Sequence, residues 1–233
     1  MKGGSAAALF DRDGWWDPGC RAFASLRAVS AFRLALLRRW LPGSWCGRTV
    51  VDLGCGGGLL AVPLAEDGAR VLGVDLARRA LRAAQQRRAS SLVPLVGDLT
   101  CVPVASQSAD IVLLADVLEH LAEPAAAVAE AARLLRAGGH LFVNTIHRTL
   151  RARLFAITLG EGLGFIPRGT HRWQQFVRPD ELEAMAAAAG LVRTARIGEM
   201  PRLLRTVRTG AIALRESRSL AVGYAALYCT SST

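Results

Sequence analysis

The chain has 233 residues, of which 52% are hydrophobic, and it carries a formal net charge of +10. This length suits one large domain with a sizeable core, and no apolar run reaches the ~18 residues of a membrane span. The five cysteines are scattered and form no Cys-x-x-Cys pair, which argues against a disulfide framework or a zinc ribbon. We therefore expect a protein of a reducing, cytoplasmic compartment.

The positive charge comes almost entirely from arginine, since Lys2 is the only lysine. Such a charge can attract an anionic membrane surface or nucleic acid, or it can reflect only the base composition of the genome. Because basic residues are not interleaved with aromatic ones as in RNA-binding motifs, we do not expect a nucleic-acid partner.

Residues 1–44 predict a lid and a helix ahead of the main domain. Trp15 and Trp16 precede an Asp-Pro turn, which suggests a lid or an anchor. Apolar residues then recur at helical spacing from Ala22 to Leu41, where Pro42-Gly43 ends the pattern. We expect an N-terminal lid and helical extension over 1–44 and one domain over 45–233.

Short apolar strands alternate with helical patterns of 10–15 residues from residue 45 onward. The expected strands are Thr49–Leu53, Arg70–Val74, Leu92–Val96, Asp110–Leu114, His140–Thr145, Leu191–Ile197 and Ala221–Cys229. This alternation predicts βαβ units, and hence a single doubly wound, Rossmann-like α/β sheet of seven strands. Between the last two strands, Arg202–Arg218 forms a basic connection without a clear pattern.

Residues 148–176 interrupt this rhythm, because they are too many for a plain loop between a strand and a helix. Apolar side chains such as Leu154 and Phe155 lie there among several arginines. Peripheral contact with an anionic membrane, a lid over the active site and a dimer contact all agree with this basic, apolar insertion after the fifth strand.

A glycine-rich turn follows the first strand and predicts a cofactor site. Glycines let a ligand approach the backbone closely. A dinucleotide site has the spacing Gly-x-Gly-x-x-Gly, whereas here Asp52 is followed by Gly54, Gly56 and Gly58. S-adenosylmethionine suits this arrangement better, because it has no phosphate and its methionyl ammonium favours an acid such as Asp52.

Acids at the next two strand ends support the same cofactor. Asp75 can accept hydrogen bonds from both ribose hydroxyls, and Asp98 can accept one from the adenine amine. As isolated features these acids could be ordinary turn caps, but their order along the chain favours S-adenosylmethionine.

Together these features resemble the class I S-adenosylmethionine-dependent methyltransferases over residues 45 to 145. The resemblance implies that Gly54, Gly56 and Gly58 line the methionyl and ribose region and that Asp75 binds the ribose. It further implies that Asp98 and Leu99 flank the adenine and that Ala115 contacts the cofactor through its backbone.

Three candidate catalytic residues follow the fourth strand. If a helical turn begins there, Asp116, Glu119 and His120 share one face. Two carboxylates and an imidazole can bind a divalent cation such as Mg²⁺ or Zn²⁺, which would lower the pKa of a phenol from about 10. Alternatively, His120 alone could serve as a general base, with His147 and His171 as further candidates for the pocket.

A narrower resemblance rests on motifs spread over the chain. They are Trp15-Trp16-Asp17-Pro18, Asp116-x-x-Glu119-His120, Pro167-x-Gly169-Thr170-His171-x-Trp173 and Phe176-x-Arg178-Pro179-Asp180-Glu181-Leu182. The chain in these respects resembles the ubiquinone-biosynthesis O-methyltransferase family.

That resemblance implies a phenolic or catechol substrate with a polyprenyl tail, a divalent metal held by Asp116, Glu119 and His120, and membrane contact through the insertion. Arg33 matches the arginine that binds the cofactor's carboxylate. The chain departs from the family at Arg27, His147 and Gly223, so methylation of another small molecule stays open, as does a non-catalytic cofactor- or lipid-binding role. The oligomeric state is left open.

Overall fold

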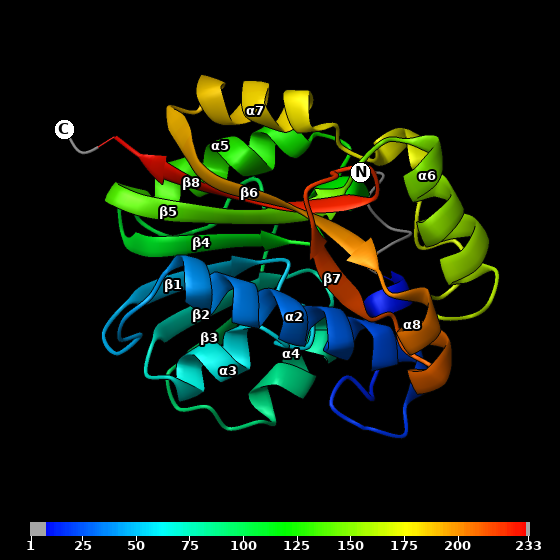
Figure 1. The fold of residues 1–233 in the computed structure, drawn as a ribbon. Coiled ribbons are helices and arrows are strands. Elements are labelled where there is room, and N and C mark those ends of the chain that lie inside the picture. The colour runs from blue at the N-terminus through cyan, green and yellow to red at the C-terminus, as the bar shows by residue number, and fades with distance from the viewer. Residues whose placement is uncertain (1–7, 232–233) are drawn as a thin grey trace.

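The computed structural model describes residues 8–231, and its strands form one eight-stranded sheet in the order β3-β2-β1-β4-β5-β8-β6-β7 (Figure 1). Five strands run parallel: β1 (Thr49–Leu53), β2 (Arg70–Asp75), β3 (Leu92–Val96), β4 (Ala109–Ala115) and β5 (Leu135–Ile146). Three further strands, joined by antiparallel pairing, complete it: β6 (Leu191–Pro201), β7 (Leu214–Ser217) and β8 (Gly223–Thr230). The doubly wound α/β architecture is thus confirmed.

The sheet has one strand more than the seven that the sequence predicts. The extra strand, β7, lies in the basic connection Arg202–Arg218 and pairs with the end of β6 at the sheet edge. The same connection holds α8 (Leu203–Thr209). Neither element packs an apolar face on the core, since Leu203, Leu204 and Val207 of α8 are all exposed.

Helices cover both faces of the sheet, and Figure 1 shows them in two layers. On one face lie α2 (Ala24–Trp40), α3 (Ala61–Glu66) and α4 (Arg78–Gln85), whose apolar side chains share a core cluster with Val50. On the other face lie α5 (Pro124–Leu134) and α7 (Pro179–Ala188), which share a cluster with Val51. Adjacent strand residues point to opposite faces, and so each strand contributes to both cores.

The insertion expected over 148–176 is helical over much of its length. It holds α6 (Leu150–Ala152), a π-helical segment η3 (Arg153–Glu161) and a 3₁₀ turn η4 (Trp173–Gln175). Ala152 and Ala156 pack on Phe176, which anchors the segment beside the end of β5. In the part of the chain that the structure describes, no helix is long and apolar enough to cross a membrane.

Two short 3₁₀ turns complete the secondary structure: η1 (Arg21–Phe23) ahead of α2, and η2 (Leu118–His120) after β4. The neighbouring strands β1 and β4 mark the point where the strand order reverses. In such sheets the ligand crevice lies outside the carboxyl ends of the strands at this switch point.

Candidate active site

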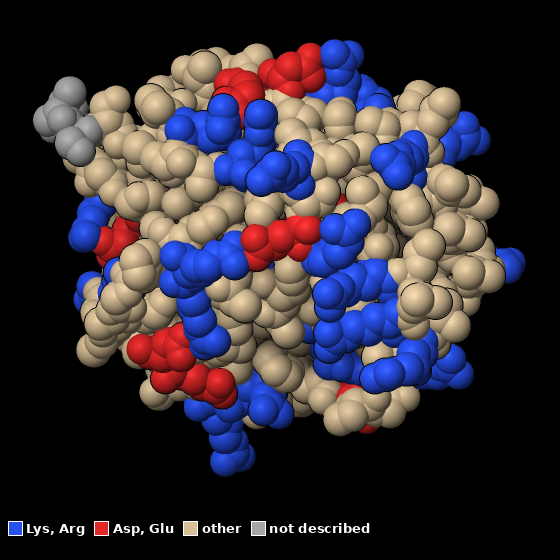
Figure 2. Space-filling view, in the orientation of Figure 1, with Lys and Arg blue, Asp and Glu red and all other residues tan. Residues whose placement is uncertain are grey.

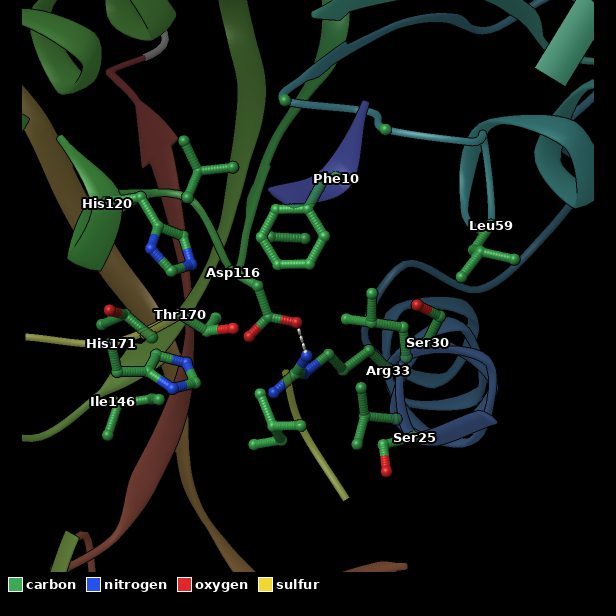
Figure 3. A pocket seen from close by; sticks show the side chains of 18 of the residues that line it. Phe10, Ser25, Ser30, Arg33, Leu59, Asp116, His120, Ile146, Thr170 and His171 are labelled. Carbon is green, nitrogen blue, oxygen red and sulfur yellow. Dashed lines mark hydrogen bonds and ion pairs between the residues drawn. The ribbon is translucent and has the colours of Figure 1, made fainter. Parts of the chain in front are cut away.

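A cavity of about 340 Å³ lies at the carboxyl ends of the parallel strands (Figure 3). Most of the residues that the sequence predicts for the site line it: Arg33, Asp52, Gly54, Gly56, Asp75, Asp98, Leu99, Ala115, Asp116 and His120. Gly58 instead packs against α4, where an added Cβ would lie 2.8 Å from the Cβ of Ala84. Glu119 is buried behind the wall, with 1% of its surface exposed.

The glycine turn is shaped by close neighbours as well as by its own dihedral angles. Gly54 has φ +81° and Gly56 has φ +51°, a region that side chains disfavour. A Cβ on Gly54 would lie 2.4 Å from Cγ2 of Val117, and one on Gly56 would lie 2.5 Å from the ring of Trp15. The turn therefore needs glycine both for its path and for the packing of the N-terminal segment.

That N-terminal segment covers the glycine turn. Trp15 is buried and stacks on Phe23 with 4.4 Å between ring centroids, and Trp16 Nε1 donates to the carbonyl of Gly57 at 2.7 Å. The guanidinium of Arg27 donates to the carbonyl of Trp15 at 3.1 Å and braces the segment from α2. Both Trp15 and Phe10 line the cavity.

The strand-end acids have different surroundings. Asp75 accepts hydrogen bonds from the amides of Gly56 and Ala77, each at 2.8 Å, so it ties the glycine turn to the end of β2. Burial raises its pKa, although these backbone hydrogen bonds partly offset the shift. Burial together with the charge of Asp75 raises the pKa of Asp52 to about 7. Asp98 is exposed, and hydrogen bonds from Thr100 lower its pKa.

These residues fit S-adenosylmethionine. Asp52, Asp75 and Asp98 place three carboxyl groups on a cavity wall, which suits a cationic adenosyl ligand better than a pyrophosphate. Gly54 and Gly56 line the same cavity and carry no side chain. When bound, S-adenosylmethionine supplies an electrophilic methyl group on sulfur.

Arg33 lies in a buried network of carboxylates. Its guanidinium donates to both oxygens of Glu199, at 2.8 to 3.3 Å, and forms an ion pair with Asp116 that Figure 3 marks. Burial opposes its charge, but the two carboxylates outweigh this and raise its pKa. The sequence did not point to Glu199, because it lies 166 residues away on β6.

The three residues after β4 do not share one face, contrary to the expectation. Asp116 has φ +54° and directs its oxygens to Arg33 and to Asn144. Glu119 points inward and accepts a hydrogen bond from Thr145 Oγ1 at 2.7 Å. Burial, with the charge of Asp116, raises the pKa of Glu119 to about 8.

The predicted metal triad is therefore not formed. Glu119 Oε1 has no hydrogen-bond partner among the described residues, a feature that by itself suits a cation. However, within residues 8–231 no three acidic, histidine or cysteine side chains converge into a group that could hold a metal ion. In this arrangement Asp116, Glu119 and His120 do not fit a divalent cation.

The histidines divide into two kinds. The rings of His120 and His171 both line the cavity and stack with 5.5 Å between centroids (Figure 3). Burial, with the neighbouring His171, lowers the pKa of His120 to about 4, so its imidazole is neutral at physiological pH. His147 does not line the cavity; its Nδ1 lies 3.0 Å from the carbonyl of Leu220.

Comparison with known proteins identifies the family. Residues 51–143 match the family described as a methyltransferase domain. The ubiquinone biosynthesis O-methyltransferase of Ralstonia nicotianae is 39% identical over 182 residues, which cover 76% of this chain and 75% of that protein. The chain belongs to this family of O-methyltransferases. The enzyme of the same description from Bordetella pertussis is 38% identical, with 79% of this chain and 78% of that protein covered.

Solved structures support the fold. A Thermotoga maritima methyltransferase, described as a possible histamine N-methyltransferase, aligns with a TM-score of 0.69 at 21% identity, covering 96% of this chain and 99% of that one. Magnesium protoporphyrin IX methyltransferase from Synechocystis, with bound S-adenosylhomocysteine, aligns with a TM-score of 0.65 at 20% identity, covering 96% and 92%. The fold is thus shared with these methyltransferases, and the curated relatives together with the methyltransferase-domain match show that the protein is an S-adenosylmethionine-dependent methyltransferase.

Proposed function

We propose that this enzyme methylates a phenolic hydroxyl of a polyprenylated catechol or hydroquinone precursor in ubiquinone biosynthesis. The main support is the extent of the match, since the relatives that carry this description align over three quarters of their length. The cavity agrees with such an acceptor: beyond the glycine turn its walls include Phe155, Phe165 and Ile166 from the insertion. An aromatic ring with an apolar tail would bury well against these side chains.

For the cofactor we propose the roles that the class resemblance gives. Asp75 would accept the ribose hydroxyls, Asp98 and Leu99 would flank the adenine, and Ala115 would contact the cofactor through its backbone. Asp52 and the turn of Gly54, Gly56 and Gly58 would surround the methionyl and ribose region. Arg33 would face the methionyl carboxylate while Glu199 holds its guanidinium in place.

The reaction is an in-line attack of the acceptor oxygen on the sulfur-bound methyl group. The protein contributes mainly by orienting the two reactants and by excluding water. We propose that residues 8–44 act as the lid, because Trp15 and Phe10 cover the cofactor side of the cavity. Asp116 and His120 line the same cavity as the glycine turn and the insertion, and the acceptor hydroxyl would lie beside them.

Peripheral contact with an anionic membrane would give the enzyme access to a tailed substrate. Two elements with exposed apolar side chains support this idea. Leu150 and Leu163 of the insertion are exposed, and α8 presents Leu204 with 91% of its surface exposed. Figure 2 shows basic side chains gathered over β7 and α8; the exposed arginines there are Arg202, Arg205, Arg208, Arg215 and Arg218. Arginines around apolar side chains suit anionic headgroups.

A methyl-transfer assay with S-adenosylmethionine and short-chain polyprenyl catechols tests the function directly. We expect mass spectrometry to detect a product that is one methyl group heavier. An arm with a chelator measures whether a divalent cation contributes. Binding of S-adenosylmethionine without methylation of any catechol would contradict the proposal and favour a non-catalytic relative.

Flotation with vesicles tests the membrane contact separately. We expect the protein to float with vesicles that contain phosphatidylglycerol and not with neutral ones. Leu204→Glu should weaken flotation without changing the thermal stability, because the side chain makes almost no contact with the rest of the protein. Equal flotation of both forms would reject α8 as a contact.

A further inference from the structure

The insertion holds a buried carboxylate that the proposed cofactor roles leave unused. Glu161 ends η3 and is 6% exposed. Its Oε2 accepts a hydrogen bond from the amide of Gly169 at 2.7 Å, and its Oε1 accepts one from the amide of His171 at 2.9 Å. Oε1 also lies 3.0 Å from Nδ1 of the His171 ring. The carboxylate thus bridges the ends of the loop 162–168 and binds His171 through both its backbone amide and its ring.

The ring of His171 is held on three sides. Glu161 contacts its Nδ1 edge, His120 stacks on its face, and Phe176 packs against it with 5.8 Å between centroids and an interplanar angle of 76°. The ring is one of the side chains that line the cavity. It therefore has one fixed orientation beside the place where an acceptor hydroxyl would lie (Figure 3).

The hydrogen bond fixes which nitrogen carries the proton. Burial acts to raise the pKa of Glu161, but hydrogen bonds from His171 and Gly169 outweigh it and leave the pKa lowered. An ionised carboxylate only accepts hydrogen bonds, so Nδ1 of His171 must carry a hydrogen. In the neutral ring, Nε2 then has the free lone pair. A carboxylate in this position orients the ring and stabilises the imidazolium.

We propose that His171, oriented by Glu161, is the general base that accepts the proton of the acceptor hydroxyl. As the oxygen–methyl bond forms, the methyl–sulfur bond breaks and its electron pair stays on sulfur. The hydroxyl proton moves to Nε2 of His171. One positive charge is lost at sulfur and one appears on the imidazolium, beside the carboxylate of Glu161. The methyl group moves from sulfur to oxygen and the proton moves from oxygen to His171, so the step needs no further reactant.

This inference rests on the proposed phenolic acceptor, and it selects between two histidines. His120 lines the same cavity, but within residues 8–231 no ion pair joins a carboxylate to its ring. His171 has such a partner at hydrogen-bond distance. His171 is the proposed catalytic residue, and Glu161 is a positioning residue that acts through it.

The test compares acceptors of different acidity. With a short-chain catechol, His171→Ala should lower kcat by about 10²- to 10⁴-fold, the usual contribution of a general base. Glu161→Gln should lower kcat by up to about 10⁴-fold, as when an amide replaces the carboxylate that orients a catalytic histidine. Neither change should alter the affinity for S-adenosylmethionine, measured by calorimetry. A nitro-substituted catechol, already ionised at neutral pH, should restore turnover in both variants. His147→Ala, outside the cavity, is the matched control and should resemble the wild type.

Each other outcome overturns the inference. Equal losses with both catechols would mean that His171 only stabilises the loop. If the nitro-substituted catechol restored turnover in His120→Ala but not in His171→Ala, His120 would be the general base. If His171→Ala does not fold, Glu161→Gln gives an independent answer, since wild-type turnover in that variant would refute the positioning role. If the wild-type enzyme methylates no catechol, the proposed function itself is refuted. If the wild-type enzyme is active and both variants are equally active, only this inference is refuted.

Discussion

Removal of the Arg33 side chain should expose how much the buried ion network contributes to stability. Arg33 is 6% exposed and Glu199 is 2% exposed, with Arg33 Nη2 and Glu199 Oε2 at 2.8 Å. Arg33→Met leaves Glu199 as a buried carboxylate without its cation, which typically costs about 3–5 kcal/mol. For a chain of this size, each kcal/mol lowers Tm by about 2–4 °C, so we expect Tm to fall by roughly 6–20 °C at pH 8.

The same helix provides the control. Arg39 pairs with Glu216 at 2.6 Å, but both side chains are largely exposed, so Arg39→Met should cost less than about 1 kcal/mol. Thermal unfolding followed by circular dichroism measures both changes. In the Arg33→Met background, Glu199→Gln should recover part of the loss, because the unpaired charge is then gone. If Arg33→Met lowers Tm no more than Arg39→Met, the network does not hold α2 against β6.

Four further substitutions test other parts of the site. Glu119→Gln should stabilise the protein by about 4 kcal/mol more at pH 9 than at pH 5, because burial raises its pKa from 4.5 to about 8. A carboxyl group whose pKa is higher in the folded than in the unfolded state favours folding below about pH 4.5, and this contribution is lost as the pH rises through 8. Equal shifts of the urea midpoint at pH 5 and pH 9 would contradict the prediction. Asp75→Ala should weaken S-adenosylmethionine binding, measured by calorimetry, by roughly 10- to 100-fold. Asp98→Ala should weaken it by less than about tenfold, because Asp98 is exposed. If Asp98→Ala had the larger effect, the assignment of Asp75 to the ribose would be wrong. Gly57→Ala should destabilise the protein by about 1–3 kcal/mol, because its Cβ would lie 2.3 Å from Cγ of Trp15; an unchanged Tm would mean that the lid does not pack there.

Much of the proposed cofactor site could be predicted from the sequence because its signals are local. A short apolar strand, a glycine turn and an acid at the strand end lie within a few residues of one another, as at Asp52 to Gly58. Parallel strands place their carboxyl ends at one edge of the sheet. The sequence therefore already predicted that Asp52, Asp75 and Asp98 lie close together, and in the structure all three line one cavity.

The elements that the sequence missed are short and lie at the surface. Within Arg202–Arg218, α8 has seven residues and its apolar side chains are exposed, while β7 has four residues and forms a strand through its pairing with β6. The geometry of the predicted metal triad likewise depends on the tertiary structure. The spacing of Asp116, Glu119 and His120 assumes a regular helical turn, but the chain leaves β4 with a positive φ at Asp116.

Sequence alone thus determined the fold class, the family resemblance and the cofactor side of the cavity, since these depend on patterns of neighbouring residues. Only the tertiary structure decided which charged groups meet. Arg33 joins Glu199 across 166 residues, and Glu161 reaches back to His171 when the insertion closes on itself. Such pairs form because a buried charge must find a partner wherever the fold brings one within reach, whatever their separation along the chain.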